Sequence, residues 1–284
     1  MSRTQVALLI PIVVLLAVNI AILVSAVRHD RQMLEVSFLD VGQGDAILIE
    51  SPTGVQILVD GGRDRSVLRE LGKQMDLLDR TLDVVIATHP DADHISGLAH
   101  VLERYHVAGY MAPGVESDSS PSRALQDSVE REASLVIPVR RGERVYIGGG
   151  AYIDILFPDR DVPDVETNTG SVVMRLVYGE TSFFLSGDAP ESVEDYLVSL
   201  DGKTLSSDIV KAGHHGSRTS TGPALLQATD PKYVIVSAGE GNSYGHPHQE
   251  VLDRIQEMGA GVLSTLGKGT IVVESDGKIL RARQ

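Results

Sequence analysis

The sequence predicts one α/β sandwich domain, and three features of its pattern indicate that class. Short strands dominate the first half, helices alternate with strands in the second half, and no linker divides the two. Because a sheet buries one face and a helix buries one stripe, such a mixture packs as layers of sheets covered by helices. The 257 residues that follow residue 27 suit a single domain of this kind.

An almost wholly apolar run at residues 6–27 precedes this domain. It is long enough to span a bilayer and longer than the apolar core of a usual signal peptide, so we expect an uncleaved membrane anchor. A secretory signal cleaved after Ala26 is the alternative, because the tripeptide that ends there resembles a small-residue cleavage site. Either interpretation divides the chain into a membrane or signal segment at 1–31 and a folded domain at 32–284.

The distribution of charge bears on location and partners. Arg3 lies before the apolar run and Arg28 and Arg31 lie after it, offset by Asp30, so the positive-inside rule hardly decides orientation. Because the apolar run suggests export, we expect the body of the protein, the folded domain at 32–284, to lie outside the cytoplasm. All 39 acidic residues and 24 of the 25 basic residues lie beyond residue 27, which gives that part a net charge of −15. An acidic body counts against tight non-specific DNA binding, although metal ions would reverse the charge locally.

In the first half, β-branched and apolar runs between turn residues predict strands, and apolar residues at helical spacing predict helices. Residues 42–45, with two glycines, are expected to form a tight turn, and residues 51–54 a hairpin turn. The expected strands are 34–41, 46–50, 55–59, 83–87, 109–112 and a pair formed by 135–139 and 144–147. The expected helices are 66–75, 95–106 and 122–133.

The second half begins with a strand at 152–157 and a hairpin of 171–178 and 182–186 around Gly179-Glu180. Helices and strands then alternate, which is typical of an α/β arrangement. The expected helices are 191–200, 223–228 and 248–258. The expected strands are 209–212, 233–237, 262–265 and a last hairpin that turns at Asp276-Gly277.

Four side chains able to bind metal lie on the stretch Thr88–Gly97, THPDADHISG, between an expected strand and an expected helix. His89 and Asp91 are two apart in an extended segment and can point the same way, whereas Asp93 and His94 are adjacent and diverge. This arrangement suits two neighbouring ions rather than one. Carboxylates suit hard divalent cations and imidazoles suit Zn²⁺, so the stretch predicts a metal site more readily than a simple helix cap.

This stretch resembles the H-x-H-x-D-H signature of metallo-β-lactamase-fold hydrolases, with Asp91 in place of the second His. Together with FLDVGQGDAILIE, NTGSVVMRLVYG, FFLSGDAP and KAGHHGSRTST, it closely resembles the hydrolase domain of the competence protein ComEC family, from about Leu34 to the C-terminus. The resemblance implies an αββα sandwich of the metallo-β-lactamase fold. It also implies a metal site at one edge of the two mixed sheets.

The resemblance further implies a ligand set for two divalent ions. His89 and Asp91 would hold the first ion, and Asp93 and His94 would hold the second. Asp188, at the end of the strand in FFLSGD, would bridge the two. The last ligand is His215, which matches the family's His-Gly pattern better than His214, although the reverse assignment stays open. The six metal ligands expected are His89, Asp91, Asp93, His94, Asp188 and His215.

One departure from the family concerns the stretch Asn168–Ser171, where many of these enzymes have a further His and this chain has none. Three carboxylates and three imidazoles make a harder pair of sites than is typical of zinc, so Mn²⁺ is expected beside Zn²⁺ as a cofactor. The missing ligand also leaves a coordination position open, which catalysis needs and a structural site does not.

Several other residues are candidates for supporting roles. Asp60 matches a position from which the family orients a metal-bound His, with a strand-end turn as the alternative. Gly44 and Asp45 are expected to shape the floor of the site. Further polar residues would contact phosphate or a leaving group, or would only cap helices and pack loops; these are Ser217, Arg218, Thr219, Ser220, Thr221, Asn242, His246 and His248.

The function expected is that of a metal-dependent hydrolase, a phosphodiesterase or nuclease in which a hydroxide bridged by two metals attacks phosphorus. Asp93, His214 and His246 are the expected catalytic residues, with one of the two histidines protonating the leaving oxygen. The expected partners are a phosphodiester such as single-stranded DNA and the membrane, and the chain is expected to be a monomer. The alternatives are a hydrolase of another ester, such as phosphorylcholine, teichoic acid or a lactone, and a membrane-anchored metal-binding accessory protein.

Overall fold

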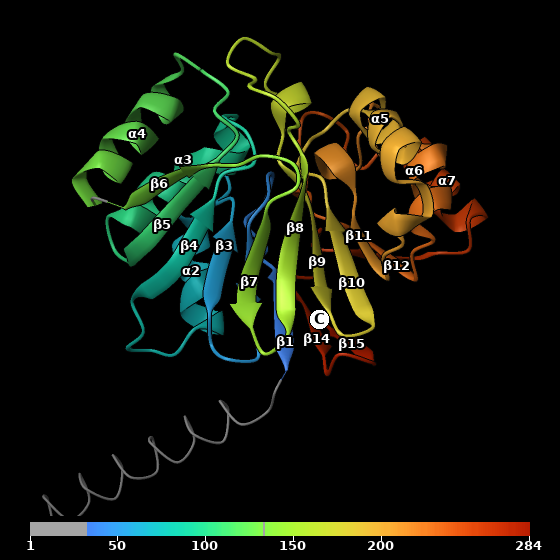
Figure 1. Ribbon diagram of the computed structural model, residues 1–284, viewed down its shortest axis with the longest axis horizontal. Coiled ribbons are helices and arrows are strands. Elements are labelled where there is room, and N and C mark those ends of the chain that lie inside the picture. The colour runs from blue at the N-terminus through green and yellow to red at the C-terminus, as the bar shows by residue number, and fades with distance from the viewer. Residues whose placement is uncertain (1–32, 133) are drawn as a thin grey trace, which may run out of the picture.

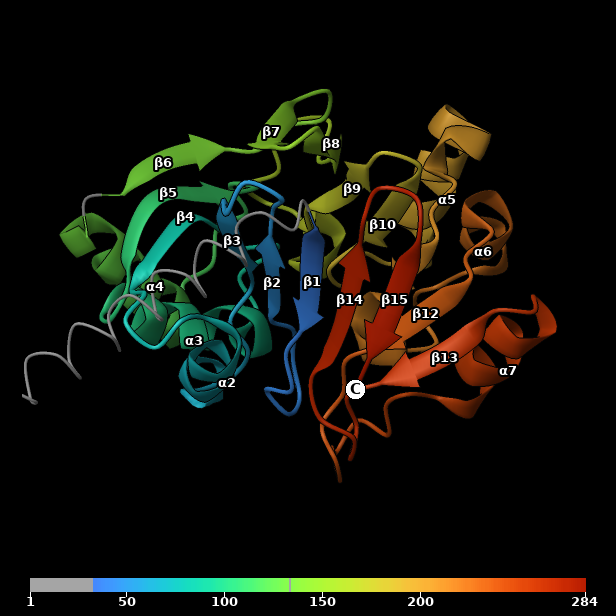
Figure 2. The same ribbon diagram turned by 90° about the horizontal axis from the view of Figure 1, so that it is seen from below.

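Two β-sheets face each other in the computed structural model, which describes residues 33–132 and 134–284 (Figure 1). The first sheet has eight strands in the order β15-β14-β1-β2-β3-β4-β5-β6, and the second has seven in the order β13-β12-β11-β10-β9-β8-β7. Helices cover the outer faces, as Figures 1 and 2 show from two directions. The expected αββα sandwich is therefore confirmed. The apolar run expected to anchor the chain lies outside the described residues, and within them no helix is both long and apolar enough to cross a bilayer.

The first sheet is antiparallel at one side and parallel at the other. Its strands are β1 (Leu34–Phe38), β2 (Ile47–Glu50), β3 (Gln56–Val59), β4 (Thr81–Ile86), β5 (His106–Ala112), β6 (Leu135–Pro138), β14 (Ile271–Ser275) and β15 (Leu280–Arg283). Strands β3 to β6 run parallel to one another, so their carboxyl ends meet at one edge of the sheet. The stretch Thr88–Gly97, which carries four of the expected ligands, follows β4 at that edge.

The second sheet has the same division. Its strands are β7 (Arg144–Gly148), β8 (Ala151–Phe157), β9 (Val173–Tyr178), β10 (Thr181–Leu185), β11 (Ile209–Lys211), β12 (Tyr233–Val236) and β13 (Gly261–Ser264). Strands β10 to β13 are parallel, and the segments that leave their carboxyl ends carry most of the remaining polar candidates. Ligand sites in open α/β sheets form at such carboxyl ends.

Six helices and three single turns of 3₁₀ helix complete the described residues. The helices are α2 (Ser66–Gln74), α3 (Ala92–Leu102), α4 (Ser120–Glu132), α5 (Glu191–Asp201), α6 (Pro223–Thr229) and α7 (Gln249–Glu257). The 3₁₀ turns are η1 (Asn168–Gly170), η2 (Gly202–Leu205) and η3 (Gly213–Gly216). Helices α2 to α4 pack on the first sheet and α5 to α7 on the second, and each group closes its own apolar cluster.

A third apolar cluster fills the space between the two sheets. Phe38 and Ile57 of the first sheet meet Met174, Phe183 and other residues of the second there, and all four side chains are fully buried. Burying side chains of this size contributes on the order of 2 kcal/mol each. This inner layer fixes the two sheets face to face, and the expected metal ligands then come from both sheets at one edge.

The structure corrects two details of the sequence-based prediction. Strands β6 and β7 do not pair, because β6 joins β5 in the first sheet and β7 joins β8 in the second. Both are edge strands, and the short connection between them crosses from one sheet to the other. Helix α3 begins at Ala92 and ends at Leu102, so Asp93 and His94 lie in its first turn and His106 begins β5 instead of ending the helix.

Candidate metal centre

Asp60, at the end of β3, anchors the stretch that carries the first ligands. Its Oδ1 accepts a hydrogen bond from the backbone N–H of Thr88 at 2.8 Å, and its Oδ2 accepts one from the Thr88 hydroxyl at 2.7 Å. Nδ1 of His94 lies 2.8 Å from the same Oδ2. The carboxylate is fully buried, so its negative charge is directed entirely at these partners. Asp60 is therefore in the contact expected of a residue that orients a metal-binding histidine.

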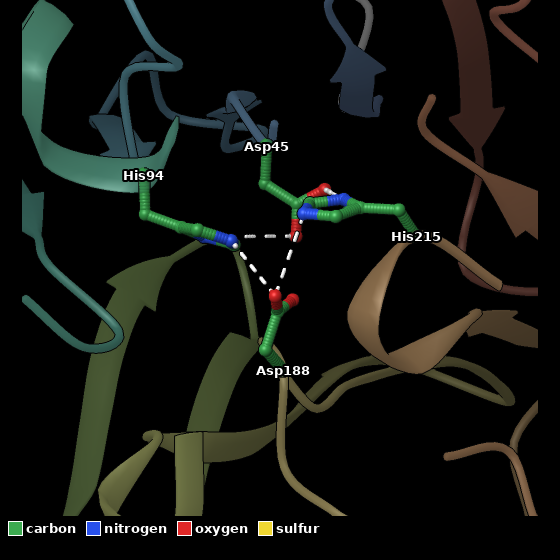
Figure 3. Close-up of side chains that lie close together, drawn as sticks. All are labelled: Asp45, His94, Asp188 and His215. Atoms are coloured by element: carbon green, nitrogen blue, oxygen red, sulfur yellow. Dashed lines mark ion pairs between the residues drawn. The ribbon is translucent and has the colours of Figure 1, made fainter. Parts of the chain in front are cut away.

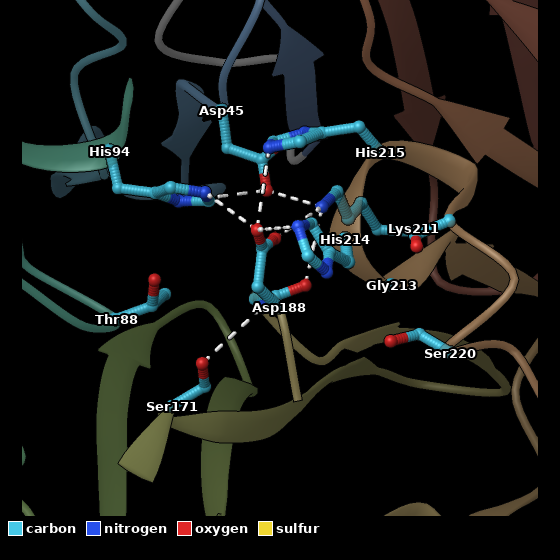
Figure 4. Close-up of polar contacts among 12 residues, drawn as sticks. Asp45, Thr88, His94, Ser171, Asp188, Lys211, Gly213, His214, His215 and Ser220 are labelled. Atoms are coloured by element: carbon cyan, nitrogen blue, oxygen red, sulfur yellow. Dashed lines mark hydrogen bonds and ion pairs between the residues drawn. The ribbon is translucent and has the colours of Figure 1, made fainter. Parts of the chain in front are cut away.

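Four imidazoles turn one ring nitrogen toward a single oxygen of Asp188. The Oδ2 atom of Asp188 lies 3.2 Å from Nε2 of His94, 3.4 Å from Nε2 of His215 and 3.7 Å from Nε2 of His214. Nε2 of His89 lies 4.0 Å from it. Figure 3 shows His94 and His215 facing Asp188 from different elements, and Figure 4 adds His214. Asp188 thus occupies the centre expected of a bridging ligand.

His89, His94 and His214 each have a hydrogen-bond partner at the other ring nitrogen, and His215 has a carboxylate oxygen near it without the geometry of a hydrogen bond. Asp60 holds Nδ1 of His94, and Oδ1 of Asp45 faces Nδ1 of His215 at 3.3 Å. The hydroxyl of Thr88 gives its hydrogen to Asp60, so at 3.0 Å it accepts one from Nδ1 of His89. Nδ1 of His214 lies 3.3 Å from the Thr219 hydroxyl. Protons held at Nδ1 leave Nε2 free to bind metal, which is the usual way proteins orient such ligands.

Two further carboxylates lie at the more exposed side of this group. Oδ2 of Asp91 is 3.8 Å from Nε2 of His89, and Oδ2 of Asp93 is 3.4 Å from Nε2 of His215. Their side chains are 39% and 24% exposed, whereas those of Asp188, His89 and His215 are buried. All six expected ligands are therefore brought together. The two aspartates line the side by which solvent reaches the centre.

The donor atoms fit divalent metal ions. Asp45, His94, Asp188 and His215 each offer an atom within 4.8 Å of the others, and all four are buried. Nε2 of His89, His94 and His215 and Oδ1 of Asp188 are buried and make no hydrogen bond to any described residue. Buried polar atoms without partners are costly, and nitrogen beside carboxylate oxygen is a donor set that Zn²⁺, Mn²⁺ and similar ions accept.

Without metal, His94 and His215 hold protons because their pKa values are raised. Burial alone would lower the pKa of His215, but Asp188 and Asp45 raise it to about 9. The pKa of His94 is likewise raised well above its usual value by Asp188 and Asp60, against the effect of burial. Burial, followed by repulsion from His94, lowers the pKa of His89 to about 3. Metal binding requires neutral imidazoles, so it must displace protons from His94 and His215.

The backbone around η3 is strained in a way that places two consecutive histidines. His214 and His215 have φ of 47° and 56°, a left-handed conformation that costs non-glycine residues roughly 1–2 kcal/mol each. This backbone conformation allows both rings to leave the same turn and point toward Asp188. Such strain is characteristic of functional sites, where the surrounding structure maintains it.

Gly44 shows why the turn after β1 needs glycine. Its φ is 120°, and a Cβ atom there would collide with the backbone carbonyl of Asp93. The N–H of Asp45 points at the same carbonyl at 3.3 Å. The turn therefore packs directly against the first turn of α3. This contact brings Asp45 under the metal centre, in agreement with the expected role of this turn as its floor.

Sequence reasoning missed Lys211, the last residue of β11. It is 1% exposed, its Nζ contacts Oδ2 of Asp45, and the same Nζ lies 3.7 Å from Oδ1 of Asp188. Burial opposes its charge, but the two aspartates raise its pKa above the ordinary value, so it stays protonated. A lysine that closes an apolar strand just before GHHG is the signal that could have revealed it, because buried lysines are rare unless paired.

The loop after β12 brings His246 to the edge of the centre. Its ring packs edge-on to that of His214, with centroids 5.4 Å apart, and stacks on Tyr244. Asn242 holds the loop through four hydrogen bonds within it, two donated and two accepted. Burial and the neighbouring His214 lower the pKa of His246 to about 4, so this ring is neutral at pH 7. His248 lies farther out and accepts the N–H of Arg218.

Residues 217–221 form the turn that supports His214 and do not begin a helix, because α6 starts at Pro223. Ser220 and Thr221 are buried, and Thr221 accepts the N–H of Gly213. In the stretch without a histidine, Ser171 accepts the N–H of Asp188 at 3.3 Å. These residues shape the backbone that presents the ligands.

Comparison with known proteins agrees with this geometry. Residues 39–240 match the family model described as the metallo-beta-lactamase superfamily. The chain therefore belongs to that superfamily and is a metal-dependent hydrolase of it. Divalent metal ions are accordingly its cofactors.

Among curated proteins, the chain is 32% identical over 255 residues to ComE operon protein 3 of Bacillus subtilis, and 31% identical over 243 residues to Recombination protein 2 of Haemophilus influenzae. Each match covers 84% of this chain, but only 32% and 28% of the respective relative. The chain thus spans about a third of the length of these relatives. The resemblance to ComEC-type proteins is confirmed over the hydrolase domain.

Solved structures show the same fold at low identity. The metallo-beta-lactamase fold protein YhfI from Bacillus subtilis aligns with a TM-score of 0.55 at 14% identity, covering 84% of this chain and 98% of that one. Igni18, a metallo hydrolase from the archaeon Ignicoccus hospitalis, aligns with a TM-score of 0.57 at the same identity and coverage.

Proposed function

We propose that this chain is a phosphodiesterase that uses two divalent metal ions and acts on single-stranded DNA or a smaller phosphodiester. One observation carries the proposal: four histidine Nε2 atoms converge on a single oxygen of Asp188, with further carboxylates beside them. A single structural ion would not use so many donors. Two ions bridged by Asp188 would activate water as the nucleophile and neutralise charge on the phosphate.

The positions suggest a role for each ligand. Nε2 of His89 lies 3.8 Å from Oδ2 of Asp91, and these two residues would hold one ion. Nε2 of His215 lies 3.4 Å from Oδ2 of Asp93, and these two would hold the second ion with His94. Asp93 would also be catalytic, because it is one of the two carboxylates at the exposed side where substrate arrives.

His214 is the better candidate to transfer a proton to the leaving oxygen. Its side chain is 29% exposed, whereas those of His215, His94 and His89 are buried. It therefore reaches both the centre and the solvent side. His246, with its ring against His214, would hold that ring in place and contact substrate. Burial lowers the pKa of both rings, to about 4 for His246, so the preference for His214 rests on its exposure and its contact with Asp188.

The donor set favours Mn²⁺ as well as Zn²⁺, because the carboxylates Asp91, Asp93 and Asp188 add hard oxygen donors to the imidazoles. Elemental analysis of the purified body should give close to two ions per chain after growth with both metals supplied. Absence of both metals would reject the proposal. Chelation should abolish hydrolysis, and the activity regained with each metal would identify the preferred one.

A polyanionic substrate has to overcome the charge of the protein. The name Recombination protein 2 connects one relative with recombination, and we take DNA as the substrate of this chain as part of the proposal. With a body at −15, cleavage of single-stranded DNA should be weak and should depend on salt, because repulsion acts beyond the metal ions. Bis(p-nitrophenyl) phosphate, being small, should be hydrolysed with Mn²⁺ or Zn²⁺. A substrate panel should also contain double-stranded DNA, phosphorylcholine and a lactone.

One feature favours a small ester as the second candidate substrate. A cavity of about 530 Å³ lies behind His89 and Pro90, within the size range of small-molecule sites. Glu116, Asp118 and Glu130 line it, and no lysine or arginine does among the described residues. This acidic lining would repel an anionic part of a substrate, such as a further phosphate group. The cavity therefore suits a neutral or cationic group better. Turnover of the lactone alone would move the protein away from phosphodiesters, and a metal-loaded protein inert on the whole panel would support an accessory role.

We also propose that the apolar run at residues 6–27 anchors the chain in a membrane with its body outside the cytoplasm and that the body is a monomer. The length and composition of the run support the anchor. A reporter fused after Gln284 should be active only outside the cytoplasm. Activity only in the cytoplasm would overturn this topology and any role in handling external DNA. Light scattering of the body without residues 1–31 would give its oligomeric state.

A further inference from the structure

Lys211 is a buried cation inside a centre that is expected to hold other cations. Its ammonium group contacts Oδ2 of Asp45 and lies 3.3 Å from the carbonyl oxygen of Gly187, to which it donates a hydrogen bond. It approaches Oδ1 of Asp188 at 3.7 Å, whereas the histidines approach Oδ2. Figure 4 shows its side chain reaching between Asp45 and Asp188. Burying an ammonium group is costly, so the fold keeps it there only because these carboxylates compensate its charge.

Asp45 could act in either of two ways. Its carboxylate is buried and close enough to His94, Asp188 and His215 to be a metal ligand itself. However, its Oδ2 contacts Lys211, and its Oδ1 faces Nδ1 of His215, the ring nitrogen directed away from Asp188. With both oxygens facing these groups, Asp45 lies behind His215, where its charge can orient the ring through an ion-pair contact rather than a hydrogen bond. The contact with Lys211 favours the second role. It holds Oδ2 of Asp45, the oxygen that could otherwise rotate toward a metal ion.

The charges of the centre agree with this arrangement. Five carboxylates surround the histidines: Asp45, Asp60, Asp91, Asp93 and Asp188. Two divalent ions and one ammonium group would balance these five negative charges within the protein. Without the ammonium group, one carboxylate would be left uncompensated in a buried place, and the nearest cation it could reach would be a metal ion.

We propose that Lys211 is a positioning residue that keeps Asp45 from becoming a metal ligand, so that a coordination position stays open for water and substrate. The proposal rests on the metal centre of the proposed function. It differs from a structural role in one measurable respect. Loss of a merely structural lysine would weaken metal binding, whereas loss of a lysine that restrains Asp45 would strengthen binding and impair turnover.

The experiment compares Lys211→Met with the wild type in the whole chain. We expect Zn²⁺ affinity, measured by competition with a chromophoric chelator, to rise about tenfold, because one more carboxylate joins the ligands. The visible absorption of the Co²⁺-loaded protein should fall in intensity, since it decreases as the coordination number rises. Hydrolysis of bis(p-nitrophenyl) phosphate should fall at least about tenfold in kcat, because the open position is filled.

Lys232→Met is the matched control. Lys232 directly precedes the adjacent strand β12. Its Nζ lies 2.8 Å from Oδ1 of Asp208, but its side chain is on the surface. Its loss should change neither Zn²⁺ affinity nor the Co²⁺ spectrum. Weaker Zn²⁺ binding by folded Lys211→Met with an unchanged Co²⁺ spectrum would overturn the proposal, and so would a variant identical to the wild type.

Asp45→Asn provides a test that does not require the lysine variant to fold. The amide oxygen can still face His215, so the Co²⁺ spectrum should match that of the wild type if Asp45 is not a ligand. A changed coordination number in this variant would overturn the proposal. In the double variant Lys211→Met/Asp45→Asn, the Co²⁺ spectrum should return to that of the wild type. A wild-type chain that binds no metal would instead reject the proposed function itself.

Discussion

Nδ1 of His94 lies 2.8 Å from Oδ2 of Asp60, and the same buried oxygen accepts the hydroxyl of Thr88. Through Thr88 the carboxylate also reaches His89, so a single residue at the end of β3 orients two histidines of the ligand stretch. The contact joins strand β3 to helix α3. The arrangement of the expected ligands therefore involves a residue outside the expected ligand set.

Substituting Asp60 should accordingly weaken metal binding without removing a ligand. We expect Asp60→Asn to lower metal affinity about 10–100-fold, the usual cost of losing a partner that orients a ligand. Asparagine is the suitable substitution because it tolerates the φ of 57° found at this position. Competition with a chromophoric chelator measures the affinity.

Asp79→Asn is the matched control for this change. Asp79 accepts the N–H and the hydroxyl of Thr81 through its Oδ1 on the surface, so its substitution alters the same pair of donors away from the metal centre. Its substitution should leave metal affinity unchanged. Equal affinities for Asp60→Asn and the wild type would show that the carboxylate does not orient His94.

Loss of Asp188 should have a larger effect, because its Oδ2 is the atom on which the histidines converge. We expect Asp188→Ala to lose metal and activity together, because the nearest buried carboxylate, Asp45, is engaged by Lys211 and His215. Elemental analysis and hydrolysis of bis(p-nitrophenyl) phosphate are the measurements. Asp253→Ala, on the exposed face of α7, should retain both. Full metal content in Asp188→Ala would show that Asp188 is not the bridge.

The sequence predicted the positions of most elements, because the turns at residues 42–45 and 51–54 and the strands around them follow local rules. It failed where the outcome depended on the other sheet. Strands β6 and β7 both have an apolar pattern that permits pairing with each other, and the sequence does not indicate that the chain crosses between sheets there. The first turn of α3 was missed because Ala92, Asp93 and His94 lack the apolar spacing that marked the rest of the helix.

The six expected ligands could be proposed from the sequence because each lies in a short motif whose donor atoms suit metal, and the structure brings them close together. The contacts behind them could not. The pairing of Asp45 with His215 and Lys211 joins residues 170 and 166 positions apart along the chain, and no local pattern reports such a contact. The left-handed backbone that turns both His214 and His215 toward Asp188 was likewise absent from the sequence pattern.

His214 and His215 should therefore respond differently to the same substitution. We expect His215→Asn to lose metal, because the ring is buried between Asp45, Asp93 and Asp188. His214→Asn should keep its metal and lose about 10²–10⁴ in kcat, the usual contribution of a general acid. Asparagine again tolerates the positive φ at both positions. Metal loss in His214→Asn with metal retained in His215→Asn would reverse the two assignments.

Glu194 of α5 allows a prediction about stability that does not involve metal. It is buried, and its two oxygens accept the N–H groups of Thr221 and Gly222 at 2.7 Å each, next to the turn that supports His214. Burial raises its pKa from 4.5 to about 7, in spite of these two donors. An acid whose pKa is raised by folding is protonated in the folded chain while the unfolded chain has already ionised. Its contribution to stability is therefore present below pH 4.5 and is lost as the pH rises toward 7.

The expected loss is about 3 kcal/mol between these two pH values, an order-of-magnitude figure for a fully buried group. Urea unfolding of the metal-free protein from pH 4.5 to pH 8 measures it. Glu194→Gln carries no titrating group, so its stability relative to the wild type should improve by about this amount as the pH rises, and Asp195→Asn on the exposed side of α5 is the control for removing one carboxyl. A difference that changes in the opposite direction would mean that the N–H groups of Thr221 and Gly222 outweigh burial and keep Glu194 ionised.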